Sequence, residues 1–253
     1  MSEGSAGAAR RHTLAGETRS RVARARRVVA LTGSALGAGD AVPAFSDCGT
    51  RFGGRSTADV AAPGPFFADP VTVWRWYDER RRRLAGVEPG PVHRALAGVE
   101  LRAEAFTLAT ECVDGLHRRA GSRNVLELRG SIWQIHCTLC GLRSENRDVP
   151  VTLPPPCPLC TGLARPGIVW QGEEVPRELL LRSFEALSRC DLLIVVGSPS
   201  RLQPAAAFVD VARKAGAFVL EVAAAQPRGQ SPADALLVGC PEEIVPDLLG
   251  PDG

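Results

Sequence analysis

The segment RVVALTGSALGAG, residues 27–39, decides the fold. Val28 to Leu31 form a compact run that is apolar at every position, which is typical of a parallel strand buried on both faces. A buried strand that enters a glycine-containing turn before a helix is where doubly wound α/β folds bind dinucleotides, because the helix N-terminus offers free backbone N–H groups to the pyrophosphate. The turn does not match Gly-x-Gly-x-x-Gly. Alone, it therefore indicates only a glycine-rich loop.

Similar apolar runs and helical patterns alternate along the rest of the chain. Strands are expected at 105–110, 124–128, 191–196 and 217–222, and helices near 72–85, 91–99, 177–189 and 204–215. This alternation predicts an α/β fold, a doubly wound parallel sheet of the Rossmann-like kind, over 27–136 and 163–250. Two segments interrupt it: a helical insertion at about 46–100 and a small lobe at 137–162.

The charges are unevenly distributed between the amino-terminal segment and the rest of the chain. The formal net charge is +2, from 30 basic and 28 acidic residues, but seven arginines precede Val28 against only Glu3 and Glu17. Residues 1–26, rich in Arg, Gly and Ala, are expected to be a flexible tail with at most a short helix. The remainder is slightly acidic, so we expect no specific nucleic-acid partner. No apolar run suits a signal sequence or a membrane span, and we expect a cytoplasmic protein.

Four of the eight cysteines have the spacing of a metal site. Cys137 and Cys140 form one Cys-x-x-Cys pair, and Cys157 and Cys160 form a second pair sixteen residues later. Each pair can direct two thiolates at one ion, and together they predict a tetrahedral four-sulfur zinc site. Because four protein thiolates leave no coordination position open, the expected zinc ion is structural.

Five segments in a fixed order resemble the sirtuins, the NAD-dependent protein-lysine deacylases: LTGSALGAGDAVPAF (31–45), TECVDGLHRRAG with VLELRGS (110–131), the paired cysteines, RPGIVWQGEEVP (165–176) and DLLIVVGSPSRLQPAA (191–206). The resemblance implies NAD as cofactor and an acylated lysine protein or peptide as substrate. The NAD-contacting positions that it implies are Gly33, Ala35, Pro43, Phe45, Glu111, Cys112, Asp114, Gly197 and Ser198. The acyl-lysine positions are Val169, Trp170, Gly172 and Glu173.

A helical segment, WYDERRR, extends this resemblance to the bacterial branch that accepts acidic acyl groups. There a Tyr-x-x-Arg pair contacts the carboxylate of a succinyl or malonyl group, and the matching residues are Tyr77 and Arg80. Arginine suits this role because its guanidinium binds a carboxylate through two parallel hydrogen bonds. The neighbouring residues Arg81 to Arg83 are expected to form a solvated basic face.

The active-site positions depart from the family pattern. The position of the family's catalytic histidine is Arg129, and a guanidinium keeps its proton at neutral pH and cannot act as a general base. Glu111 and Cys112 replace a Gln-Asn pair, Ala35 replaces a glycine, and Ser46 replaces an arginine. We expect Glu111 either to pair with Arg129, which makes it a poor base, or to stand apart as a candidate catalytic carboxylate. Cys112 is expected to be a small apolar filler rather than a nucleophile.

These observations leave three functions open. The first is an NAD-dependent protein-lysine deacylase that transfers the acyl group to ADP-ribose and releases nicotinamide, impaired by Arg129. The second is a non-catalytic protein that binds NAD, ADP-ribose or acyl-lysine. The third is an NAD-consuming ADP-ribosyl transferase or hydrolase that uses Glu111.

Overall fold

The computed structural model describes residues 16–36, 51–52, 55–56, 60–170, 172–197, 205–227 and 230–250. Its main element is a six-stranded parallel sheet in the order β11-β10-β9-β1-β4-β5. The strands are β1 (Arg27–Thr32), β4 (Ala105–Thr110), β5 (Val125–Glu127), β9 (Leu192–Val196), β10 (Phe218–Ala223) and β11 (Ala235–Val238). The chain runs outward from β1 first to one side and then to the other. This order is that of a dinucleotide-binding sheet, with the reversal between β1 and β9.

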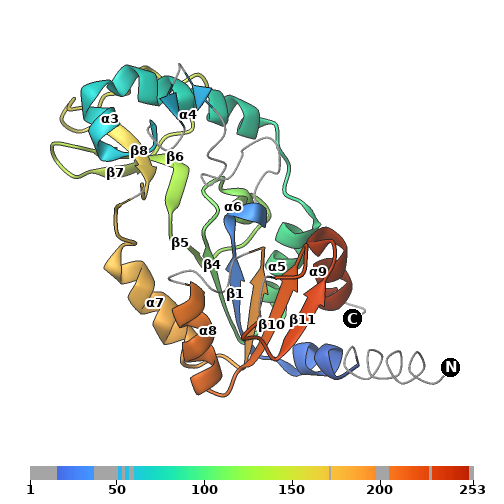
Figure 1. Ribbon diagram of the computed structural model, residues 1–253. Helices are drawn as coiled ribbons and strands as arrows, with labels where there is room; N and C mark the ends of the chain where they lie inside the picture. The colour runs from blue at the N-terminus through green and yellow to red at the C-terminus, as the bar shows by residue number, and fades with distance from the viewer. Residues whose placement is uncertain are drawn as a thin grey trace.

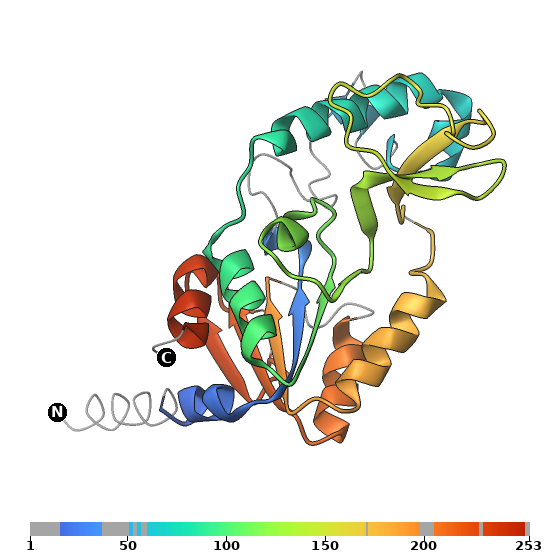
Figure 2. The same cartoon turned by 180° about the vertical axis from the view of Figure 1, so that it is seen from behind.

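Alternate side chains of each strand enter two different cores. In β1, Val28 and Ala30 pack with helices α5 (Pro91–Arg102) and α9 (Pro241–Leu249). Val29 and Leu31 pack on the opposite face with α7 (Arg177–Leu187) and α8 (Ala205–Lys214). Figures 1 and 2 show these helix pairs on the two sides of the sheet. Burial on both faces is why the central strands are continuously apolar.

A smaller lobe lies beyond the carboxyl ends of the central strands (Figure 1). It contains an antiparallel sheet, β7-β6-β8, with strands β6 (Gly130–Cys137), β7 (Arg143–Glu145) and β8 (Ala164–Ile168). Helices α3 (Pro63–Ala68) and α4 (Pro70–Ala85) pack on this lobe through a separate aromatic core that includes Phe66, Trp74, Trp133 and Trp170. The remaining short elements are η1 (Ser34–Leu36), α6 (Leu116–Arg119) and the hairpin β2 (Arg51–Phe52) with β3 (Arg55–Ser56).

The predicted α/β class and parallel sheet are confirmed, and several boundaries differ. The small lobe is wider than 137–162, because its sheet begins at Gly130 and ends at Ile168. β11 and α9 were not predicted; β11 has four half-buried to exposed residues and lies at the edge of the sheet, so its apolar signal is weak. Across the described ranges, no helix combines the length and apolarity that crossing a membrane requires.

Two arginine-rich segments differ in part from expectation. The amino-terminal segment contains a short helix, as allowed, at residues 16–24, but this helix is packed: Thr18 is buried and Val22 contacts the main core. Arg81 is not part of a solvated face: its side chain is 0% exposed, and Nε donates a hydrogen bond to the carbonyl oxygen of Ile132 at 2.8 Å. Arg82 and Arg83 are exposed, as expected.

Candidate functional site

Three of the predicted cofactor residues meet at the carboxyl edge of the parallel sheet. The backbone N–H of Gly33 donates to the carbonyl of Val196 at 3.0 Å, and that of Glu111 donates to Thr32 at 2.9 Å. These bonds continue the strand pairing past β1 and β4, so the first residues after β1, β4 and β9 lie side by side. Gly197 directly follows β9 and has φ 61°, a backbone conformation that favours glycine. This edge is where the strand order reverses, and it fits a dinucleotide.

A buried hydroxyl and imidazole network supports this edge from within. Thr32 Oγ1 lies 2.7 Å from Thr110 Oγ1 and 2.9 Å from His117 Nε2. Burial, together with the nearby ring of His93, lowers the pKa of His117 to about 3, so the imidazole is neutral at physiological pH. His117 is 2% exposed. It is therefore a structural member of this network.

Cys112 contacts Gly33, the first residue of the glycine-containing turn after β1. Its Sγ donates to the carbonyl of Gly33 at 3.2 Å, and its N–H donates to Thr110 Oγ1 at 3.0 Å. Burial raises the pKa of the Cys112 thiol far above its ordinary value, which keeps the sulfur protonated and unreactive. The filler interpretation of Cys112 fits this environment, and the nucleophile interpretation does not.

Asp114 is held in a fixed orientation at the start of α6. Its Oδ1 accepts a hydrogen bond from the N–H of Leu116 at 2.8 Å, and its carbonyl accepts one from Trp133 Nε1 at 2.7 Å. Gly115 follows with φ 77° and turns the chain into the helix. Backbone and lobe contacts thus hold Asp114 in place.

Arg129 lies where the two lobes join, in the turn between β5 and β6. Its side chain is half-buried, and its carbonyl accepts a hydrogen bond from the N–H of Val169 at 2.9 Å. The N–H of Leu128 donates to Thr110 at 2.9 Å, which places this turn beside the segment that begins at Glu111. Glu111 and Arg129 are both described residues, and no ion pair joins them.

The predicted acyl-lysine residues come together on the other side of this junction. Trp170 Nε1 donates to the hydroxyl of Tyr77 at 2.8 Å, and both side chains are buried. Burial raises the pKa of Tyr77 well above its ordinary value, so the hydroxyl keeps its proton and has it available for donation. Arg80 is one helical turn further along α4, with its guanidinium 3.8 Å from the centre of the Trp76 ring, and burial lowers its pKa to about 10.

Arg165, which no sequence pattern singles out, clamps the predicted acyl-lysine segment. Its guanidinium binds both carboxylate oxygens of Glu173, at 2.6 and 2.8 Å, and also donates to the carbonyl of Ile168 at 2.9 Å. The same group lies 3.6 Å from the ring centre of Trp170. Glu173 in turn accepts from the N–H of Trp170 at 2.8 Å, and Arg165 lowers the pKa of its carboxyl. Glu173 therefore shapes the turn that begins at Trp170.

The four predicted zinc ligands form one cluster. Their Sγ atoms all lie within 4.8 Å of one another, with Cys137 and Cys160 3.5 Å apart and Cys140 and Cys157 3.7 Å apart. Zinc–sulfur bonds of about 2.3 Å in a tetrahedron place the sulfurs about 3.8 Å apart, so the cluster fits one zinc ion. All four ligands come from the chain, which makes the site structural.

The two halves of this cluster repeat one backbone geometry. Gly141 and Thr161 each follow the second cysteine of a pair, with φ 73° and 59°. Each donates its N–H to the carbonyl of the first cysteine of its pair, at 3.2 and 3.0 Å. The N–H groups of Leu139 and Leu159 approach the sulfurs of Cys137 and Cys157 at 3.3 and 3.4 Å. Such N–H contacts stabilise the thiolate form that a metal binds.

Some predicted positions lie outside the described residues. These are Pro43, Phe45 and Ser198, together with Ser46; of Ala35 only the backbone, within η1, is described.

Comparison with known proteins gives consistent matches along the chain. The Sir2 family model matches residues 38–204. The chain is 39% identical over 240 residues to NAD-dependent protein deacylase 1 of Pseudomonas aeruginosa, covering 90% of this chain and 95% of that one. It is 40% identical over 195 residues to NAD-dependent protein deacylase 1 of Caldanaerobacter subterraneus, covering 77% and 81%. A solved complex of a Sir2 homologue with NAD superposes with a TM-score of 0.82 at 33% identity, covering 92% of each chain.

Proposed function

This chain belongs to the Sir2 family, and we propose that it is a cytoplasmic NAD-dependent protein deacylase that removes acyl groups from lysine side chains. The observation that carries the proposal is the junction at Arg129. Its carbonyl binds the backbone of Val169, the first residue of the acyl-lysine segment, while its turn lies beside Glu111 at the cofactor edge. An acyl-lysine along 169–173 and a dinucleotide at the edge of the sheet would meet at this point.

The chain's own residues account for binding and orientation at this junction. When bound, NAD supplies a ribose carbon open to attack by the acyl oxygen and nicotinamide as the leaving group. Gly33 and Gly197 offer close backbone approach at the sheet edge, and Asp114 presents a fixed carboxylate to the nicotinamide side. Trp170 and Val169 would flank the acyl-lysine.

We further propose that catalysis is slow, because Arg129 cannot accept a proton from the ribose hydroxyls. Loss of a positioned base typically costs about 10²- to 10⁴-fold in rate. Release of nicotinamide does not need that base, so this first step would continue even where complete deacylation is lost. The second candidate is an NAD-consuming hydrolase or transferase that uses Glu111, whose backbone N–H pairs with Thr32 at the cofactor edge of the sheet.

Tyr77 and Arg80 support a preference for acidic acyl groups. The Tyr77 hydroxyl receives the indole N–H of Trp170 and keeps its own proton to donate, and Arg80 adds a positive charge one turn away. A succinyl or malonyl carboxylate would be bound by both. An acetyl group offers no such partner. Arg80→Gln should therefore raise KM for a succinylated peptide and leave KM for an acetylated peptide nearly unchanged.

Mass spectrometry of a succinylated and an acetylated peptide, each incubated with NAD, tests the proposal. We expect slow NAD-dependent loss of the acyl group, and faster loss with Arg129→His. Release of nicotinamide from NAD without any peptide would instead favour the hydrolase. NAD binding by calorimetry without turnover in either variant would overturn the deacylase proposal in favour of a non-catalytic binding protein.

A further inference from the structure

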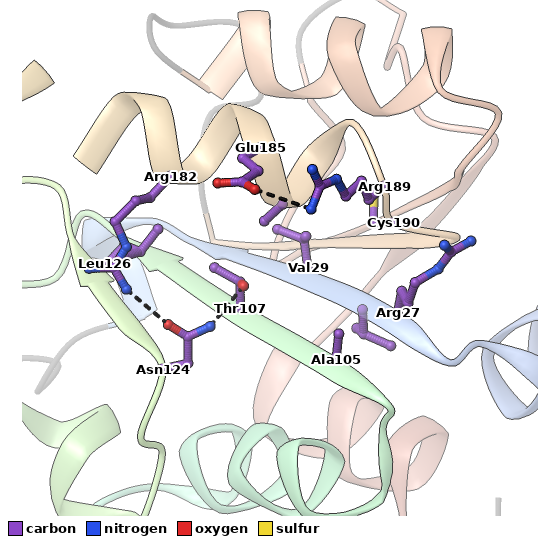
Figure 3. A pocket seen from close by; sticks show the side chains of 12 residues that line it. Arg27, Val29, Ala105, Thr107, Asn124, Leu126, Arg182, Glu185, Arg189 and Cys190 are labelled. Atoms are coloured by element: carbon purple, nitrogen blue, oxygen red, sulfur yellow. Dashed lines mark hydrogen bonds and ion pairs between the residues drawn. The ribbon is translucent and has the colours of Figure 1, made fainter. Parts of the chain in front are cut away.

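A cavity lies at the opposite end of the sheet from the cofactor edge. It has a volume of about 430 Å³ and lies between α7 and the amino-terminal halves of β1 and β4 (Figure 3). Arg27 and Ala105 are the first residues of these strands, and Asn124 precedes β5. None of the residues placed in the cofactor or acyl-lysine site lines it. Its size is that of a small-molecule site.

Apolar side chains make up much of the cavity lining. Val29, Leu126 and Ala186 line the cavity together with Ala105 and Cys190. The Cys190 thiol donates to the carbonyl of Leu187 at 3.3 Å, and burial raises its pKa to about 11, so it contributes a small neutral surface. Such a surface suits the apolar body of a ligand.

Three arginines stand at the two ends of this apolar surface, and two of them have a carboxylate partner. Arg189 pairs with Glu185 at 3.1 Å, and Arg27 lies 4.0 Å from Asp191. Figure 3 shows Arg182 at the other end, over Leu126 and Asn124. Arg27 and Arg189 therefore each have an acidic partner at their end of the cavity.

Arg182 is different, because its partner is neutral. Its Nη2 donates to Oδ1 of Asn124 at 3.3 Å, and among the described residues no carboxylate pairs with it. Asn124 is itself fixed, because its Nδ2 donates to the carbonyl of Phe106 at 2.8 Å and to Thr107 Oγ1 at 2.9 Å. The guanidinium is therefore directed to this end of the cavity with most of its five N–H donors available.

We propose that this cavity is a binding site for an amphipathic monocarboxylate, with the carboxylate on Arg182 and an aromatic or medium-chain aliphatic body along Leu126, Val29 and Ala105. One uncompensated guanidinium matches one carboxylate and can bind it through two parallel hydrogen bonds. A phosphate dianion is a poorer match, because the other two arginines already have acidic partners. The site does not depend on the proposed deacylase activity.

Isothermal titration calorimetry of the full chain with 2-naphthoate tests the site, with 2-naphthalenemethanol as the neutral analogue. We expect 1:1 binding of the carboxylate, and binding of the alcohol weaker by about tenfold, the usual value of one charge-assisted interaction. Arg182→Gln should remove this difference by weakening naphthoate about tenfold. Arg177→Gln, on the same helix but outside the cavity, should leave both affinities unchanged.

A second variant locates the ligand. Ala105 is exposed at the start of β4, so Ala105→Trp places an indole in the cavity at a position where the sheet tolerates a large side chain. We expect this variant to fold with an unchanged circular dichroism spectrum and to lose naphthoate binding. Unaltered binding in Ala105→Trp or Arg182→Gln would overturn the proposal, as would equal affinity for the acid and the alcohol, or no binding to the wild-type chain.

Discussion

The hydrogen bond between Trp170 and Tyr77 provides the sharpest test of how the small lobe is held together. The indole N–H and the phenol oxygen are 2.8 Å apart, and the two side chains are 1% and 0% exposed. Tyr77→Phe removes one oxygen and leaves the ring in place. The Trp170 N–H is then buried without an acceptor, which costs about 1 to 3 kcal/mol. We expect the free energy of unfolding to fall by about 2 kcal/mol.

Urea unfolding of a double-mutant cycle measures this term. Trp170→Phe loses packing as well as the N–H, but in the double variant no donor is left without an acceptor. The double variant should therefore be more stable than the sum of the two single losses predicts, by about 1 kcal/mol. Trp133→Phe, combined with Tyr77→Phe, is the matched control. The Trp133 indole donates to the carbonyl of Asp114 and not to Tyr77, so the losses of these two variants should add. Strict additivity of Tyr77→Phe and Trp170→Phe would refute the reasoning.

Three further perturbations test the backbone, the metal cluster and the buried imidazoles. Gly130→Ala places a methyl group 2.0 Å from a backbone carbonyl oxygen, whereas Gly121→Ala, also at positive φ, meets no atom within 4 Å; urea unfolding should show Gly130→Ala to be the more destabilising by about 2 kcal/mol. Cys157→Ser should lower the metal content below one zinc per chain and reduce the thermal midpoint, while Cys240→Ser, outside the cluster, should change neither. Burial lowers the pKa of His117 to about 3, so near pH 6.5 the imidazole binds a proton in the unfolded chain but not in the folded chain. The free energy of unfolding should therefore fall as the pH drops from about 6.5 to 4, by up to about 1.4 kcal/mol per pH unit. Urea unfolding at several pH values should show a shallower slope in His117→Gln.

Local patterns predicted the features that depend on local chemistry. The side chains of Val28 to Leu31 enter two cores alternately because both faces of β1 are covered. A continuous apolar run is the direct sequence signal of such two-sided burial. The paired cysteines likewise predicted the metal cluster from spacing alone, since each knuckle is formed by consecutive residues.

Features that depend on distant partners were beyond the sequence. The burial of Arg81 is stabilised by the carbonyl of Ile132 and the side chain of Asn146, which are 51 and 65 residues away. In the sequence of α4, nothing distinguishes the buried Arg81 from the exposed Arg82 and Arg83. The clamp of Arg165 on Glu173 crosses a strand end and an irregular turn, where neither the helical nor the strand period places two side chains together.

Backbone contacts fix the position of Arg129. Its carbonyl binds the N–H of Val169, and the preceding and following residues are tied to Thr110 and to β8. An imidazole placed there by Arg129→His would therefore occupy the same point of the junction without rearranging it. A rise in deacylation would assign the loss of rate to the missing proton acceptor alone. An unchanged rate in a variant that still binds NAD would instead place the defect in the other altered positions, Glu111 and Cys112 foremost, because the geometry around residue 129 would be intact.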